Sequence, residues 1–192
     1  MKKIILSLTL FAAATAFSFG QQVISSSGTT TTNPNIGTFE NEVKINFLNL
    51  IWLGSFEVAY ERYLSESHSI EFQGLINDRF GFNNEKNGKK YKTNSVQAAM
   101  HFYFGDSGKG RFHIFPLVKV RFGEFEEPSD GGVVTTDMTS FILGAGAGYK
   151  WEVSEHFAFG PYASIARGFS EEVNDRFSGI EVNGGFSLGY RF

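Results

Sequence analysis

The chain contains 192 residues with a formal net charge of −3, so one domain is expected and no basic surface for nucleic acid is indicated. It has no cysteine, which excludes disulfides, thiolate metal sites, a cysteine nucleophile and lipid attachment at an N-terminal cysteine. Its 22 Phe and 22 Gly against only 4 Pro favour an all-β fold, because aromatic residues favour strands and glycine suits tight turns.

The N-terminus has the features of a secretory signal peptide. Two lysines precede an apolar stretch over residues 4–17, and small residues occupy the cleavage-determining positions before Gln21. We therefore predict a signal peptide over residues 1–20 and export from the cytoplasm. Residues 21–42 are rich in Ser, Thr and Asn and predict a flexible periplasmic segment.

From residue 43 onward, apolar and polar residues alternate with a period of two in eight segments. The segments are 43–53, 55–64, 69–79, 93–104, 111–124, 135–153, 157–167 and 177–192. Each is near or above the roughly nine to eleven residues that a tilted strand needs to cross a bilayer. Their even number, with no run of eighteen apolar residues after the N-terminus, predicts an eight-stranded antiparallel transmembrane β-barrel over residues 43–192.

The connections between these segments alternate in length. Short connections are expected at 65–68, 105–110 and 154–156, and long polar ones at 80–92, 125–134 and 168–176. Short periplasmic turns and long external loops are typical of outer-membrane barrels. The connection near Gly54, on the external side, is too tight for this pattern.

The last segment ends the chain on an aromatic residue. Strand side chains alternate between faces, so its apolar residues share one face while Glu181 and Arg191 share the other. This strand resembles the terminal strand of bacterial outer-membrane barrels, in which the final aromatic belongs to the assembly signal. The residues assigned to this signal are Phe186, Leu188, Tyr190 and Phe192.

Alternation alone does not identify the outer face, because a soluble barrel with an apolar interior gives the same pattern. Gly144, Gly146 and Gly148 lie opposite an apolar face, and glycine inside a narrow barrel makes room for long neighbours. Aromatic residues on the apolar face also gather beside the short turns, as in an interfacial girdle. The apolar face is therefore predicted to contact lipid, with Phe80, Phe82, Phe122 and Phe177 at the other rim.

The opposite face is expected to fill the barrel interior. Both charge signs occur there in comparable numbers, and buried charges require ion pairs and hydrogen bonds. We predict a lumen closed by an ion-pair network of Lys44, Glu57, Glu61, Glu71, Lys119, Arg121, Glu181 and Arg191. The other residues expected to point inward include Asn46, Gln73, Gln97, His101, His113, Lys150 and Asn183.

Catalysis and metal binding have weaker support in the sequence. The residue types of a hydrolase acting on lipid A occur together on the inward face at Ser95, His101, His113 and Glu71. The two histidines lie beside a short turn, on the side of the membrane away from lipid A, which favours a structural, hydrogen-bonded role. With Glu71 they also lack the spacing of a metal site. We predict no catalytic residue, no metal site and no cofactor.

Charged residues concentrate in the long connections. Acidic groups occur at Glu124, Glu126, Glu127, Asp130, Glu171, Glu172 and Asp175, and basic groups at Lys86, Lys89, Lys90 and Lys92. These charges suit either a solvated loop surface or contact with lipopolysaccharide phosphates and external partners, and the first is favoured.

The stretch KINFLNLIWLGSFEVAYERYLSES, residues 44–67, resembles small outer-membrane β-barrel proteins of the Bacteroidota type, with Tyr60, Glu61 and Arg62 at the strand end. The resemblance spans about residues 43–192. It implies an eight-stranded barrel in the outer membrane without a periplasmic domain, and it carries over no catalytic residue.

These observations favour a non-enzymatic outer-membrane protein that serves envelope structure or surface interaction through its external loops. Its expected partners are outer-membrane lipid, lipopolysaccharide and the barrel assembly machinery, and it is expected to be a monomer that binds no nucleic acid. Two alternatives stay open: a lipid-A-modifying enzyme, and a soluble periplasmic barrel that binds an apolar ligand inside.

Overall fold

The computed structural model describes residues 40–78, 88–105 and 110–192. The predicted signal peptide and nearly all of the segment 21–42 lie outside the described residues. So do Arg79, the expected rim residues Phe80 and Phe82, and Lys86.

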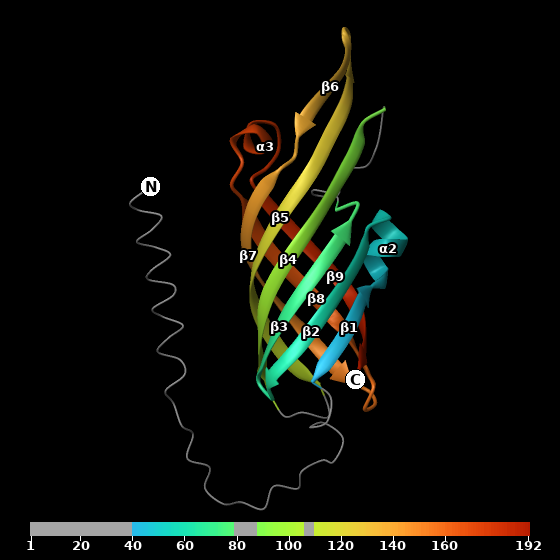
Figure 1. Ribbon diagram of the computed structural model, residues 1–192, viewed down its shortest axis with the longest axis vertical. Helices are drawn as coiled ribbons and strands as arrows, with labels where there is room; N and C mark the ends of the chain where they lie inside the picture. Colours follow the sequence, from blue (N-terminus) through green and yellow to red (C-terminus); the bar gives the residue numbers. More distant parts are fainter. Residues whose placement is uncertain (1–39, 79–87, 106–109) are drawn as a thin grey trace, which may run out of the picture. The chain divides into compact units, whose positions relative to one another are not determined.

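Eight strands form a closed antiparallel barrel, which confirms the predicted fold class (Figure 1). They are β1 (Asn41–Asn46), β2 (Phe56–Ser65), β3 (His68–Ile76), β4 (Lys90–Phe104), β5 (Arg111–Ser129), β7 (Ser140–Glu152), β8 (Phe157–Gly168) and β9 (Ile180–Arg191). Strands next to each other in this order pair side by side, and β9 closes the barrel by pairing with β1.

The two ends of the barrel differ as the connection lengths predict. The C-terminus and the start of β1 lie at the end that carries the short turns (Figure 1). The opposite end carries the short strand β6 (Gly132–Asp137) and the helices α2 (Phe47–Leu53) and α3 (Glu171–Arg176). Neither helix is long and apolar enough to cross a membrane, and no other helix occurs in the described residues.

The first predicted strand, 43–53, was wrong beyond Asn46, because the chain continues there as helix α2. The Asn46 side chain accepts a hydrogen bond from the Asn49 backbone N–H at 3.3 Å and so caps the helix N-terminus. Gly54 ends the helix with φ 65°, a left-handed conformation that glycine adopts without a Cβ penalty. In place of the tight connection expected near Gly54, the chain forms helix α2 between β1 and β2.

The long connections, which were expected on the external side, also differ from prediction. The segment 125–134 is not a loop, because β5 continues to Ser129 and pairs with β6 as a hairpin. The predicted strand 135–153 is therefore two strands, since β6 ends at Asp137 and β7 begins at Ser140. The β-branched run from Val133 to Thr136 explains this, since such residues favour strands. The connection 168–176 likewise contains α3.

A small apolar core forms where these external elements meet. Tyr91, Phe125, Met138 and Val173 are buried together, and Phe177 packs against them. Phe177 was expected at the lipid-facing rim, and this was wrong. It packs instead 5.1 Å from the Phe125 ring, measured between ring centroids, because α3 folds back onto the hairpin.

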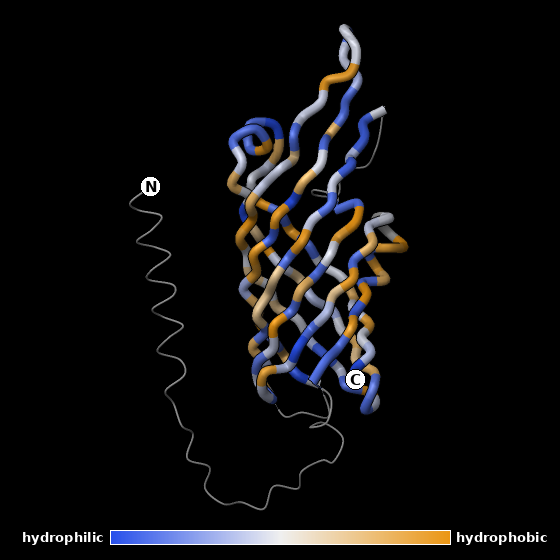
Figure 2. The backbone as a smooth tube through the Cα atoms, viewed as in Figure 1, coloured by the Kyte–Doolittle hydropathy of each residue, from blue (hydrophilic) through white to orange (hydrophobic). Residues whose placement is uncertain are grey.

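Hydrophobic and hydrophilic residues alternate along the barrel strands (Figure 2). The exposed side chains on these strands are mostly apolar, whereas the buried ones include most of the charged residues. Val118 and Leu143, for example, are 45% and 40% exposed, whereas their neighbours Lys119 and Ile142 are buried. A Cβ added to Gly146 or Gly148 would overlap the rings of Phe115 and His113 respectively. These glycines therefore face inward and make room for larger side chains, as predicted.

Candidate functional site

The barrel interior contains most of the predicted site residues, and they fall into separate clusters. In the first, Lys44 Nζ lies 2.7 Å from Glu61 and also pairs with Glu71. Lys150 Nζ pairs with the same Glu61 at 2.7 Å and with Glu42 at 3.0 Å. Each carboxylate thus has at least one lysine partner, as a buried charge requires. Glu42 was not anticipated as a member, because the predicted strand began after it.

The second cluster lies toward the end of the barrel that carries α2, α3 and β6. Arg121 pairs with Asp78 at 2.8 Å and with Glu181 at 2.5 Å, and Lys119 reaches the same two acids at 3.3 and 2.9 Å. Ser95 donates a hydrogen bond to Asp78 at 2.5 Å. Asp78 was missed because the alternation of the predicted segment 69–79, with Glu71 and Gln73 inward, assigns it to the outward face. Strand β3 ends at Ile76 and Asn77 has a positive φ of 57°, so the alternation is broken before the buried Asp78.

The third cluster closes the short-turn end. Glu152 joins Arg111 at 2.6 Å and Arg191 at 3.6 Å. The Arg111 guanidinium also lies 4.5 Å from the ring centroid of Tyr103, and that of Arg191 lies 5.3 Å from Tyr63. The two guanidinium groups share the single Glu152 carboxylate, and these cation–π contacts give each of them a further favourable partner. Arg191 was predicted for the lumen, but its partner Glu152 was not.

The remaining predicted member, Glu57, has a different environment. It is buried, yet it forms no ion pair with any residue that the structure describes. Asn46, Asn49 and Gln73 instead donate side-chain amide hydrogen bonds to its carboxylate. Glu57 is therefore connected to its neighbours by hydrogen bonds from neutral side chains and not by an ion pair.

The two inward-facing histidines are stacked among aromatic rings. The register pairs Phe104 with Phe112 and brings the His101 and His113 rings to 5.1 Å between centroids, so they are neighbours as predicted. His101 Nε2 lies 3.5 Å from Glu71, and neither of its ring nitrogens has a hydrogen-bond partner among the described residues. The expectation of hydrogen-bonded histidines is therefore wrong for His101, since packing against Phe115 holds this ring.

The residue types of a hydrolase do not come together. Ser95 and His101 lie six residues apart on β4, which separates them by roughly 20 Å along the strand. The Ser95 hydroxyl is hydrogen-bonded to Asp78 and has no histidine beside it. Within the described residues, no group of three or more His, Cys, Asp or Glu side chains is arranged to hold a metal ion.

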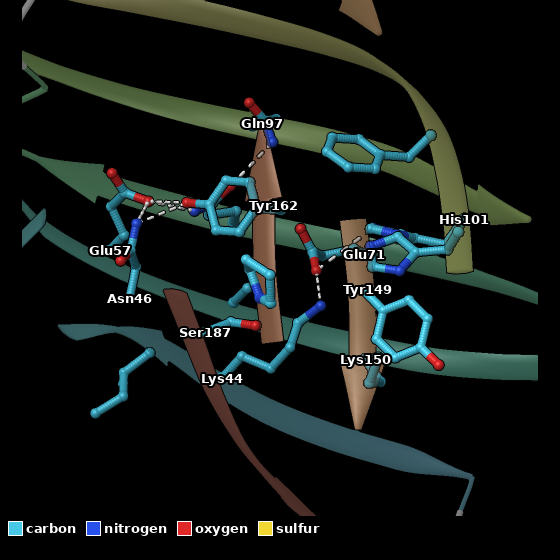
Figure 3. A pocket seen from close by; sticks show the side chains of 16 residues that line it. Lys44, Asn46, Glu57, Glu71, Gln97, His101, Tyr149, Lys150, Tyr162 and Ser187 are labelled. Atoms are coloured by element: carbon cyan, nitrogen blue, oxygen red, sulfur yellow. Dashed lines mark hydrogen bonds and ion pairs between the residues drawn. The ribbon is translucent and has the colours of Figure 1, made fainter. Parts of the chain in front are cut away.

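A cavity of about 40 Å³ lies within the lumen (Figure 3). On one side it is lined by Lys44, Glu71 and the two histidines, and on the other by Glu57, Tyr162 and neighbouring amides. Its size suits a few water molecules or a small ion.

The predicted assembly-signal residues lie on the outer face of β9 and, in the case of Phe192, directly after it. Leu188, Tyr190 and Phe192 are 41%, 48% and 50% exposed. Phe186 packs against Phe47 of α2 and Phe159 of β8, with ring centroids at 5.5 and 5.6 Å.

Solved structures with the same architecture are similar to this chain. The N-terminal β-barrel domain of Pseudomonas aeruginosa OprF aligns over 79% of this chain and 96% of its own, with 13% identity and a TM-score of 0.53. The Yersinia pestis attachment invasion locus protein Ail aligns over 80% and 99%, with 15% identity and a TM-score of 0.48. Neisserial surface protein A aligns over 79% and 92%, with 12% identity and a TM-score of 0.45.

No family model and no curated protein matches the chain. The closed barrel and the likeness to OprF together show the fold. The chain is an all-β, closed eight-stranded antiparallel barrel similar to outer-membrane β-barrel proteins.

Proposed function

We propose that this protein is a non-enzymatic outer-membrane β-barrel that serves envelope structure or surface interaction through its external end. The observation that carries the proposal is the reversed polarity of the barrel, with exposed apolar side chains outside and buried charges inside. A water-soluble barrel has the opposite arrangement, because apolar burial stabilises its interior. An outer-membrane barrel requires this one.

The barrel lumen is closed to solutes by its own side chains. The three charged clusters are ion-paired, and an apolar band of Ala99, Phe115, Leu117, Ile142 and Ala166 packs inside the same barrel. Eight strands leave an interior just wide enough for side chains. The protein therefore supports no sustained solute conduction.

The external elements provide the surface for interaction. Lys92 pairs with Glu126 at 2.6 Å and Lys89 with Glu127 at 3.5 Å, while Arg176 of α3 also pairs with Glu127. Much of the charge that the sequence places in these loops is thus matched within the protein, which supports a solvated, ordered surface. Lipid, lipopolysaccharide and the assembly machinery are the partners proposed for the barrel as a whole, and the protein acts as a monomer.

Fractionation and conductance test the proposal. We expect the protein in the outer-membrane fraction, resistant to carbonate wash, with heat-modifiable mobility in gels and no stable channel in planar bilayers. Release by osmotic shock would show a soluble periplasmic barrel instead. A lipid A mass spectrum that changes when the gene is deleted, and returns with it, would indicate the enzyme.

A further inference from the structure

Glu57 differs from every other buried acidic side chain in the described part of the lumen. Its residue is 3% exposed, and its carboxylate points into the interior from β2. The other lumen acids each have a lysine or arginine partner: Glu42, Glu61, Glu71, Asp78, Glu152 and Glu181. Glu57 therefore brings a negative charge that the described basic residues do not match at close range.

The hydrogen bonds around Glu57 indicate that its carboxylate is ionised. Asn49 donates to Oε1 at 2.7 Å. Asn46, Gln73 and Tyr162 donate to Oε2 at 3.0, 3.0 and 2.8 Å. An ionised carboxylate only accepts hydrogen bonds, so four converging donors fit it, whereas a protonated acid would place its own O–H against one of them.

The neutral donors distribute this charge but do not cancel it. A buried charge without a counter-charge is costly in a low-dielectric interior. Two basic residues, Lys44 and Lys150, line the same cavity. Lys44 is already shared between Glu61 and Glu71, and Lys150 between Glu42 and Glu61. A mobile cation that enters the cavity would supply the missing charge.

The cavity beside Glu57 offers the right chemistry and size. Gln97, Tyr162 and Ser187 line it with oxygen atoms, and in Figure 3 the Tyr162 hydroxyl points toward Glu57. Gln97 uses its amide nitrogen to donate to Gln73 at 2.9 Å, which leaves its carbonyl oxygen to accept. Oxygen ligands suit hard cations, and about 40 Å³ accommodates one small ion with little water.

We propose that this cavity binds one small monovalent cation of the Na⁺ or K⁺ class, held by the Glu57 carboxylate and by neutral side-chain oxygens. A single unmatched carboxylate calls for a single positive charge. A divalent ion would need further acidic or histidine ligands, and the described residues provide no such group. The proposal concerns the lumen alone and does not depend on what the external loops bind.

Thermal unfolding of the full-length protein in zwitterionic detergent tests the site. Na⁺ or K⁺ is exchanged for N-methylglucamine, a cation too large for the cavity, at constant ionic strength and pH. We expect the unfolding midpoint to rise with the logarithm of the Na⁺ or K⁺ concentration, because an ion bound only by the folded state stabilises it. The ²³Na NMR line should broaden with protein and sharpen when K⁺ is added.

Two variants and a control make the outcome specific. Glu57→Gln should abolish both the midpoint shift and the line broadening. Gln97→Met removes one neutral ligand, leaves the charge, and should move the midpoint shift to higher Na⁺ concentration. Glu126→Gln removes an external acid that pairs with Lys92 and should behave as the native protein does.

The proposal is overturned if the native protein shows no Na⁺ or K⁺ dependence, or if Glu57→Gln retains it. A midpoint that responds to pH and not to Na⁺ also overturns it. That result would mean that a proton in the lumen, and not a metal cation, supplies the missing charge. Failure of the site would leave the outer-membrane assignment untouched, since fractionation tests that independently.

Discussion

Single residues on the outer face of β5 occupy different depths of the apolar belt. Val118 lies between the outward-facing Phe112 and Phe122 and pairs with Leu143 across the strands. Val118→Arg places a charge near the middle of the hydrocarbon, so we expect it to cost about 2 to 4 kcal/mol of folding free energy. Urea titration of the protein refolded into lipid vesicles measures this cost.

A control for Val118→Arg lies on the external hairpin. Val133 is 68% exposed on β6, beyond the barrel wall, so Val133→Arg should change the folding free energy by less than about 0.5 kcal/mol. Leu143→Arg should cost about as much as Val118→Arg, because Leu143 pairs directly with Val118 and lies at nearly the same depth. Equal costs at all three positions would contradict the proposed membrane belt.

Gly146 shows how one absent side chain determines the packing of the lumen. An added Cβ there would overlap the Phe115 ring and the Ala163 carbonyl. We expect Gly146→Trp to prevent barrel closure, seen as loss of the heat-modifiable band. Gly74→Ala, where nothing lies within 4 Å of an added Cβ, should fold normally. A folded Gly146→Trp barrel would mean that this face lies outside.

At the scale of elements, helix α2 lies between β1 and β2, and its exposed side is apolar. Leu48, Leu50 and Ile51 are 37%, 44% and 80% exposed, continuing the apolar face of β1 and β2. Exposed apolar side chains in such continuity are expected to contact lipid. We therefore expect a spin label at Ile51→Cys to be relaxed by oxygen and protected from aqueous nickel reagent in vesicles.

The labelling experiment on α2 has a clean background, because the chain contains no cysteine. A label at Val133→Cys on β6 is the matched control and should respond to the aqueous nickel reagent. If the Ile51 label responds to nickel as strongly as the Val133 label, α2 stands in water and the apolar belt ends below it.

Helix α3 and the β5–β6 hairpin form an element that is stabilised separately from the lumen. Val173 of α3 is 2% exposed in the external core, and Arg176 bonds to Thr136 and Glu127 of the hairpin. Val173→Asp buries an unpaired charge, so α3 should detach while the barrel keeps its heat-modifiable mobility. Limited trypsin digestion should then cut after Arg176 faster than in the native protein. Loss of the barrel itself would show that the external core is required for folding.

For the whole molecule, alternation in the sequence was sufficient to predict the fold class, the number of barrel strands and the alternation of buried and exposed side chains, because a closed sheet forces every second side chain inward. The prediction failed where a helix cap or a left-handed residue ends the strand. Capping by Asn46 and the left-handed Gly54 are helix signals that the apolar pattern of residues 47–53 obscured. The pairing of Asp78 with Arg121 follows the left-handed conformation of Asn77, whose φ of 57° ends the alternation of β3.

The stability of the barrel should depend on its buried charges far more than on its exposed ones. Arg121 is 1% exposed and joins Asp78 and Glu181, so Arg121→Met leaves two buried carboxylates with Lys119 alone. Breaking a buried pair in this way typically costs about 3 to 5 kcal/mol.

The matched control for Arg121→Met is an exposed arginine in an ion pair of similar length. Arg62 lies 2.7 Å from Glu40, with both side chains more than half exposed, so Arg62→Met should cost less than about 1 kcal/mol. Urea unfolding of both variants in the same vesicles compares them directly, and added salt should weaken only the Arg62 contribution, since exposed charges are screened. Equal losses would mean that the lumen is wet enough to solvate its charges, and the closed interior would then have to be abandoned in favour of a water-filled one.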